Sequence, residues 1–144
     1  MKLTIYTDGG SRGNPGPAAY AIVVTKNDDI IKEYARYIGS TTNNVAEYQG
    51  AIAALKEAEN MDADEVEIVS DSQLMVRQIN GQYACRSPNL QPHLEEIRKL
   101  SKKFKNVSFT NVGRDNPLVS RADALLNQEQ DIMRSLMPRG KPNP

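Results

Sequence analysis

Residues 6–24, "YTDGGSRGNPGPAAYAIVV", join two apolar runs through a segment rich in glycine and proline. Asp8 ends the first apolar run, four glycines and two prolines follow, and the chain then becomes apolar again. Glycine and proline interrupt regular structure, so the pattern predicts two antiparallel strands joined by a turn. A turn needs one or two glycines. Four glycines, with Asn14 between two of them, indicate a second purpose for this loop.

The residues around this loop extend the pattern into a mixed sheet. Residues 2–8 alternate, with Leu3, Ile5 and Thr7 on one face. The predicted strands are 2–8, 18–26, 30–39, 65–71 and 106–112, with a hairpin turn at 27–29. The predicted helices are 42–60, which we expect to be amphipathic, 72–80, 92–104 and 118–136. Three successive strands form an antiparallel meander, and helical crossovers make the last two strands parallel. We therefore predict an α/β fold with a five-stranded mixed sheet flanked by helices.

Length and composition indicate one soluble domain. The chain has 144 residues and a formal net charge of zero. We expect residues 1–136 to form the domain and the basic, proline-rich residues 137–144 to be a flexible tail. The single cysteine, Cys85, fits a reducing compartment, so we expect a cytoplasmic protein. The N-terminus shows no signal-peptide pattern and no run reaches transmembrane length, so we expect no membrane partner.

Charge is unevenly distributed along the chain. Residues 57–71 hold seven acidic residues and no lysine or arginine. Residues 86–114 hold seven basic residues against two acidic ones. Poles of opposite sign hint at a polyanionic ligand. A solvated helix face is the simpler explanation of the basic residues, so charge alone does not identify a partner.

Four acidic residues could converge on one edge of the predicted sheet. Asp8 and Asp71 end strands, where ligands of such sheets bind, and Glu47 and Asp123 lie in helices. Each alone could be a solvated charge or a helix cap. Four carboxylates at one edge would repel one another without a cation, and oxygen ligands suit Mg²⁺ or Mn²⁺. Two such ions could clamp the attacking and leaving oxygens of a phosphodiester.

Other phosphate-binding motifs match the glycine loop poorly. A P-loop requires a Lys-Ser/Thr pair after its glycines, which is absent here. A dinucleotide-binding loop opens a helix, whereas a strand follows this loop. Haloacid-dehalogenase phosphatases carry an aspartate where Tyr6 stands. A phosphatase of that kind and a non-catalytic nucleic-acid-binding module remain as alternatives.

Four stretches in chain order resemble the type 1 ribonucleases H: "TDGGSRGNPGPAA", "TTNNVAEYQG", "SDSQLMVRQING" and "RADAL". The resemblance covers residues 2 to about 130. It implies a ribonuclease H-like fold and hydrolysis of the RNA strand of RNA–DNA hybrids, leaving 5′-phosphate and 3′-hydroxyl ends. It also implies two Mg²⁺ ions, replaceable by Mn²⁺, on a catalytic tetrad. That tetrad is Asp8, Glu47, Asp71 and Asp123. We expect a monomeric endoribonuclease.

The same resemblance assigns residues that would contact the hybrid. The implied substrate-binding residues are Gly10, Ser11, Gly13, Asn14, Thr42, Asn43, Asn44 and Gln73. Glycines let a backbone approach a ligand closely, and 2′-hydroxyls distinguish RNA from DNA. Thr42 and Asn14 resemble the family's pocket for a DNA-strand phosphate, although Ser40 stands where many relatives have arginine.

The sequence departs from many relatives at two further places. The segment 81–100 is short and lacks tryptophan, so it resembles the compact form without a basic protrusion. The loop before Asp123 carries Arg114 where many relatives have a histidine, and Val119 where asparagine is usual. We expect Arg114 to attract the scissile or departing phosphate. The only histidine, His93, is expected to be structural or solvated.

Overall fold

A computed structural model, which describes residues 1–136, contains one five-stranded sheet in the order β3-β2-β1-β4-β5. The strands are β1 (Lys2–Ser11), β2 (Gly16–Lys26), β3 (Asp29–Thr41), β4 (Glu65–Ser70) and β5 (Asn106–Asn111). β1, β2 and β3 pair antiparallel. β4 pairs parallel with both β1 and β5. The predicted meander with two added parallel strands is confirmed.

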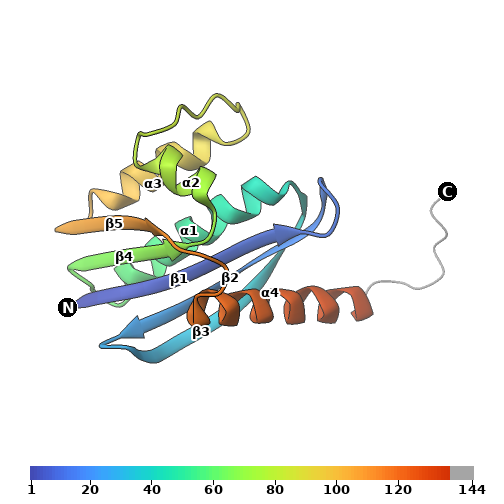
Figure 1. The fold of residues 1–144 in the computed structure, drawn as a ribbon, viewed down its shortest axis with the longest axis horizontal. Coiled ribbons are helices and arrows are strands. Elements are labelled where there is room, and N and C mark those ends of the chain that lie inside the picture. Colours follow the sequence, from blue (N-terminus) through green and yellow to red (C-terminus); the bar gives the residue numbers. More distant parts are fainter. Residues whose placement is uncertain (137–144) are drawn as a thin grey trace.

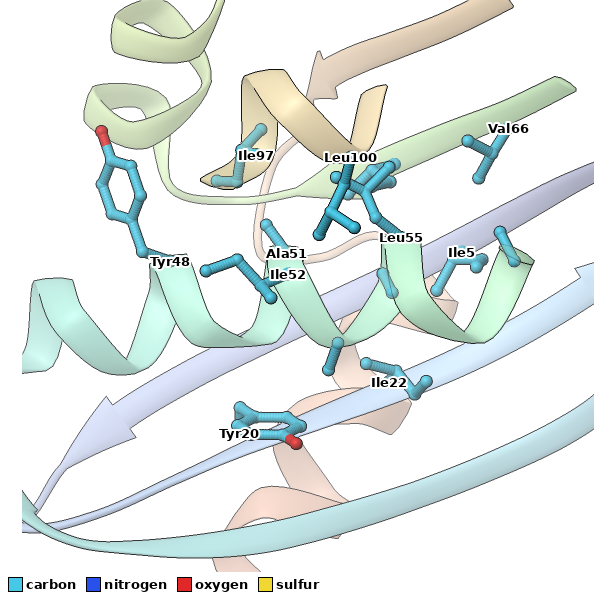
Figure 2. Close-up of a cluster of buried hydrophobic side chains, with 14 of the residues drawn as sticks. Ile5, Tyr20, Ile22, Tyr48, Ala51, Ile52, Leu55, Val66, Ile97 and Leu100 are labelled. Carbon is cyan, nitrogen blue, oxygen red and sulfur yellow. The ribbon is translucent and has the colours of Figure 1, made fainter. Parts of the chain in front are cut away.

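Helices cover both faces of the sheet. They are α1 (Asn43–Asn60), α2 (Gln73–Ile79), α3 (Gln91–Ser101) and α4 (Pro117–Leu136). α1, α2 and α3 lie on one side, and α4 lies on the other side, where it packs against β1, β2 and β3 (Figure 1). The larger core, between the sheet and α1 and α3, includes Ile5, Leu55 and Ile97 (Figure 2). On the other face, Ala122 and Leu126 of α4 pack against small residues of β2. Within the described range 1–136, no helix is long and apolar enough to cross a membrane.

Helix α1 is more buried than an amphipathic pattern predicts. Its buried residues include the expected Val45, Tyr48, Ile52 and Leu55, but also alanines on other sides of the helix. The sheet lies along one side of α1 and α3 packs against another, so only a narrow strip reaches solvent. Even Glu57 is buried, and its Oε1 forms an ion pair with Lys32 Nζ at 2.9 Å.

The glycine-rich loop is shorter than the sequence suggests, because β1 and β2 extend into it. Gly9 pairs with Tyr20 and Gly10 with Ala19, so the turn contains only residues 12–15. A Cβ on Gly9 would lie 2.5 Å from the backbone of Ala46 in α1. The missing side chain therefore lets α1 approach β1, which is a packing role that the loop's composition alone does not reveal.

Candidate active site

Two acidic residues meet where β1 and β4 stop pairing. The β1–β4 ladder ends at Tyr6 and Val69. Asp8 lies just beyond it, and Asp71 directly follows β4. We predicted that Asp8 ends its strand. That prediction is wrong, because β1 continues to Ser11 in its pairing with β2. Both carboxylates nevertheless lie at the expected edge, where the parallel ladder opens.

Helix α1 brings Glu47 to the same place. Thr42 caps the helix, its Oγ1 accepting a hydrogen bond from the Val45 amide at 3.2 Å. The close approach at Gly9 then places the first turns of α1 over the strand that carries Asp8. One carboxylate oxygen each from Asp8, Glu47 and Asp71 lies within 4.8 Å of the others. Three acids from two strand ends and one helix thus form a single cluster.

Asp123 approaches this cluster from α4, on the other face of the sheet. It lines the same cleft, of about 300 Å³, as the three clustered acids. Its side chain is exposed and it is not a member of the 4.8 Å group. The Asn127 side-chain amide donates to Asp123 Oδ2 at 3.3 Å and to the Asp123 carbonyl at 3.0 Å. The four acids that the sequence singles out therefore border one cleft, and three of them lie close to one another.

Burial and mutual repulsion favour the protonated forms of these acids. Burial, the Glu47 carboxylate and a hydrogen bond with Asp123 raise the pKa of Asp8 to about 9. Burial and the Asp71 carboxylate raise the pKa of Glu47 to about 8. Burial also raises the pKa of Asp71, against the opposing charge of Arg114. A divalent cation would take the place of the retained protons, and the all-oxygen donor set fits Mg²⁺ or Mn²⁺.

Arg114 lies at the rim of the cleft. Its Nε is 3.7 Å from Asp71 Oδ2, and 94% of its side chain is exposed. Such exposure leaves the guanidinium free to turn toward a ligand. His93, in contrast, lies on α3 and lines a separate groove with Tyr20 and Lys56. The histidine therefore does not line the acidic cleft.

The predicted substrate-binding residues divide into two groups. Gly10, Ser11 and Asn43 line the cleft. The turn and the start of α1 are joined there, because the Asn43 amide donates to Asn14 Oδ1 at 3.0 Å. The Ser11 amide donates to Asn43 Oδ1 at 3.3 Å. The remaining members do not line the cleft, and Gly13, Asn44 and Gln73 among them are exposed.

Sequence reasoning missed four polar residues that line the cleft. They are Arg12, Ser120, Asn127 and Gln130. Asn127 and Gln130 follow Asp123 by four and seven residues, which places all three on one face of a helix. That spacing was readable from the sequence. The position of Arg12 was not, because it depends on how the turn folds against α4.

Comparisons with known proteins agree with this geometry. The model of a family described as reverse transcriptase-like matches residues 6–129. The chain is 42% identical to ribonuclease HI of Halobacterium salinarum, covering 90% of this chain and 65% of that protein. It is 39% identical to a bifunctional protein of Mycobacterium tuberculosis, covering 91% and 36%. The chain thus spans about a third of the mycobacterial relative and just under two thirds of the halobacterial one.

Solved structures show the same similarity over nearly their whole length. The crystal structure of ribonuclease H1 from Halobacterium salinarum superposes with a TM-score of 0.88 at 40% identity, covering 92% of this chain and 99% of that one. The crystal structure of LC11 ribonuclease H1 in complex with an RNA/DNA hybrid gives 0.84 at 39% identity, covering 94% and 99%.

Proposed function

Because the chain belongs to the type 1 ribonuclease H family, we propose that it is an endoribonuclease that hydrolyses the RNA strand of RNA–DNA hybrids. The observation that carries this proposal is the cluster of Asp8, Glu47 and Asp71, whose oxygens lie within 4.8 Å at the open end of the sheet. Clustered carboxylates raise the free energy of the metal-free protein, so a binding role explains them better than a structural one. The hybrid bound to one solved relative supports this choice of substrate.

The four acids would hold two Mg²⁺ ions, with Mn²⁺ as a substitute. Asp8 is central, since burial, Glu47 and Asp123 all act on its pKa. Glu47 and Asp71 would complete the ligand set on one side, and Asp123 on the other. When bound, the ions would activate the attacking water and offset charge on the phosphate. The carboxylates fix the positions of these charges, and the buried floor of the cleft limits bulk water.

The chemical step would break the bond between phosphorus and the ribose O3′. An oxygen from water joins the phosphorus and the O3′ leaves with a proton, giving 5′-phosphate and 3′-hydroxyl ends. An arginine side chain is a poor general base, so Arg114 is not assigned that role. Its exposed guanidinium at the rim of the cleft would instead attract the scissile or departing phosphate.

Recognition of RNA would come from the turn after β1 and from the start of α1. Gly10, Ser11 and Asn43 line the cleft beside the acids, where 2′-hydroxyls of the bound strand could reach them. Asn14 and Thr42 support this wall through their hydrogen bonds to the α1 backbone. Gly13, Asn44 and Gln73 would extend the contact along the strand. These residues form the site without a partner subunit, so we propose a monomeric enzyme. Its single cysteine, Cys85, fits a reducing compartment, and we propose that it acts in the cytoplasm.

A panel of labelled substrates tests this function. The panel is an RNA–DNA hybrid labelled on either strand, an RNA duplex, a DNA duplex, and DNA duplexes that carry one to six consecutive ribonucleotides. We expect cleavage of the RNA strand only, and a need for several consecutive ribonucleotides. Affinity should fall steeply with salt, because phosphate contacts release counterions. Efficient cutting of the DNA duplex, or of every substrate alike, would refute the proposal.

A further inference from the structure

Asp123 is held differently from the other three acids. Asp8 and Glu47 are buried, and Asp71 is half-buried, within one tight group. Asp123 is exposed and comes from α4, which lies across the opposite face of the sheet from α1 (Figure 1). Its distance from Asp8 therefore depends on how α4 sits against β1, and its direction depends on its own rotamer. An exposed side chain needs specific contacts to keep one rotamer.

Asn127 supplies a contact that orients Asp123, in addition to the hydrogen bond between Asp123 and Asp8. It lies one helical turn further along α4, and its Nδ2 donates to both the carbonyl and the Oδ2 of Asp123, at 3.0 and 3.3 Å. An amide donor to one carboxylate oxygen fixes the plane of the carboxylate and leaves its other oxygen available to a cation. Hydrogen bonds of this kind to metal-binding carboxylates commonly set metal affinity.

Two further contacts hold α4 to the end of β1. Arg12, in the turn, donates to the Asn127 carbonyl at 3.3 Å and pairs with Asp131 Oδ1 at 2.7 Å. Gln130 Nε2 donates to the Gly10 carbonyl at 3.2 Å. Gln130 is only 5% exposed, and its Oε1 has no partner among residues 1–136. Burying an amide with an unpaired oxygen costs stability, which indicates that its bond to Gly10 serves a purpose beyond packing.

We propose that Asn127 is a positioning residue for Asp123, and that Arg12 supports it by holding α4 against the turn that follows β1. Together they fix the Asp123 carboxylate relative to Asp8 and so set the affinity with which the acidic cleft would hold a divalent cation. The inference rests on the proposed metal site. It adds that the site depends on contacts between the turn and α4, which lie outside the four acids themselves.

The test measures Mg²⁺ affinity without substrate. Asn127→Leu removes the amide, and Asn127→Asp replaces it with a group that repels Asp123. The matched control is Gln128→Leu, at the neighbouring exposed position of α4. Melting temperature is followed against Mg²⁺ concentration for each protein. We expect the half-saturating Mg²⁺ concentration to rise roughly tenfold in Asn127→Leu, more in Asn127→Asp, and not in the control. In hybrid cleavage, saturating Mg²⁺ should restore most of the turnover of Asn127→Leu.

A second comparison tests the part played by Arg12. Arg12→Met should raise the half-saturating Mg²⁺ concentration in the wild-type background and have a smaller effect in Asn127→Leu, because contacts that act together are not additive. Equal effects in both backgrounds would show that Arg12 acts independently and would overturn its assigned part.

The outcomes separate this inference from the proposed function. If both Asn127 variants respond to Mg²⁺ like the wild type, the positioning role is wrong even where wild-type cleavage is normal. A lower melting temperature in EDTA with unchanged Mg²⁺ response would mean that Asn127 is structural only, which also overturns it. A wild-type protein that neither responds to Mg²⁺ nor cuts a hybrid would refute the proposed function, and this inference with it.

Discussion

Replacing Asp8 with asparagine should stabilise the metal-free protein while abolishing its activity. Asp8 is 8% exposed and shares a 4.8 Å cluster with Glu47 and Asp71. At that separation, two ionised carboxylates repel by about 3 kcal/mol if the effective dielectric constant is about 20. Retained protons already relieve part of this repulsion, so Asp8→Asn should gain about 1–2 kcal/mol at neutral pH. For a chain of this size that is a rise of roughly 3–10 °C in melting temperature.

The variant should lose its response to Mg²⁺ and its catalysis together. An amide of the same shape lacks the charge that a cation needs, so Mg²⁺ should no longer raise the melting temperature. Hybrid cleavage should fall by about a thousandfold or more, at the upper end of the range for losing one charge-stabilising group. The assays are melting in EDTA and in Mg²⁺, and single-turnover cleavage. The control is Asp62→Asn, at an exposed position whose φ of 57° asparagine also tolerates.

Either of two results for Asp8→Asn would refute this reasoning. A lower melting temperature in EDTA would mean that Asp8 stabilises the metal-free fold rather than destabilising it. Near-normal cleavage at saturating Mg²⁺ would mean that the ion does not need this carboxylate.

Three other predictions follow from the same site. Arg114→Ala should slow turnover by roughly ten- to a thousandfold, as loss of one charged contact to the phosphate does, and His93→Ala should not; kcat and KM on one hybrid at fixed Mg²⁺ decide, and the reverse pattern would show that the wrong residue is assigned. In EDTA, stability should fall as pH rises from about 4 to 9. The pKa of Asp8 is raised from 3.8 to about 9 in the folded state, which therefore holds a proton that the unfolded chain releases. Urea midpoints across that range test the sign, and Mg²⁺ should reduce the dependence of the midpoint on pH. Gly9→Ala should cost about 2–3 kcal/mol, since its Cβ would meet the backbone of Ala46 at 2.5 Å; a wild-type urea midpoint would contradict the packing role given to this glycine.

Sequence reasoning predicted the sheet and its connections because each element carries a local signal. The alternation of Leu3 and Ile5 was enough for β1, and Thr42 was placed at the start of α1. The extent of β1 and β2 could not be predicted in the same way. Gly9 and Gly10 read as turn residues, whereas their pairing with β2 and the contact with α1 are tertiary effects.

Part of the candidate site could be predicted from the sequence for a related reason. Asp8 and Asp71 end apolar runs of the sequence, and the carboxyl ends of neighbouring parallel strands lie at one edge of a sheet. The convergence of Glu47 depends on the approach of α1 at Gly9, and the orientation of Asp123 depends on Asn127. Neither contact is indicated by the sequence pattern around these residues. The expectation of a flexible tail concerns residues 137–144, which lie outside the described part of the chain, and it stays a prediction.

The most direct test of the account is cleavage of the RNA strand of a hybrid as Mg²⁺ is titrated. Wild-type protein and Asp71→Asn are compared on a hybrid labelled at the 5′ end of the RNA, with the DNA strand labelled in a parallel reaction. The account predicts no cleavage in EDTA, saturable cleavage of the RNA strand alone with Mg²⁺, and loss of at least about a thousandfold in Asp71→Asn. Undiminished cleavage in EDTA, cutting of the DNA strand, or a fully active Asp71→Asn would contradict it.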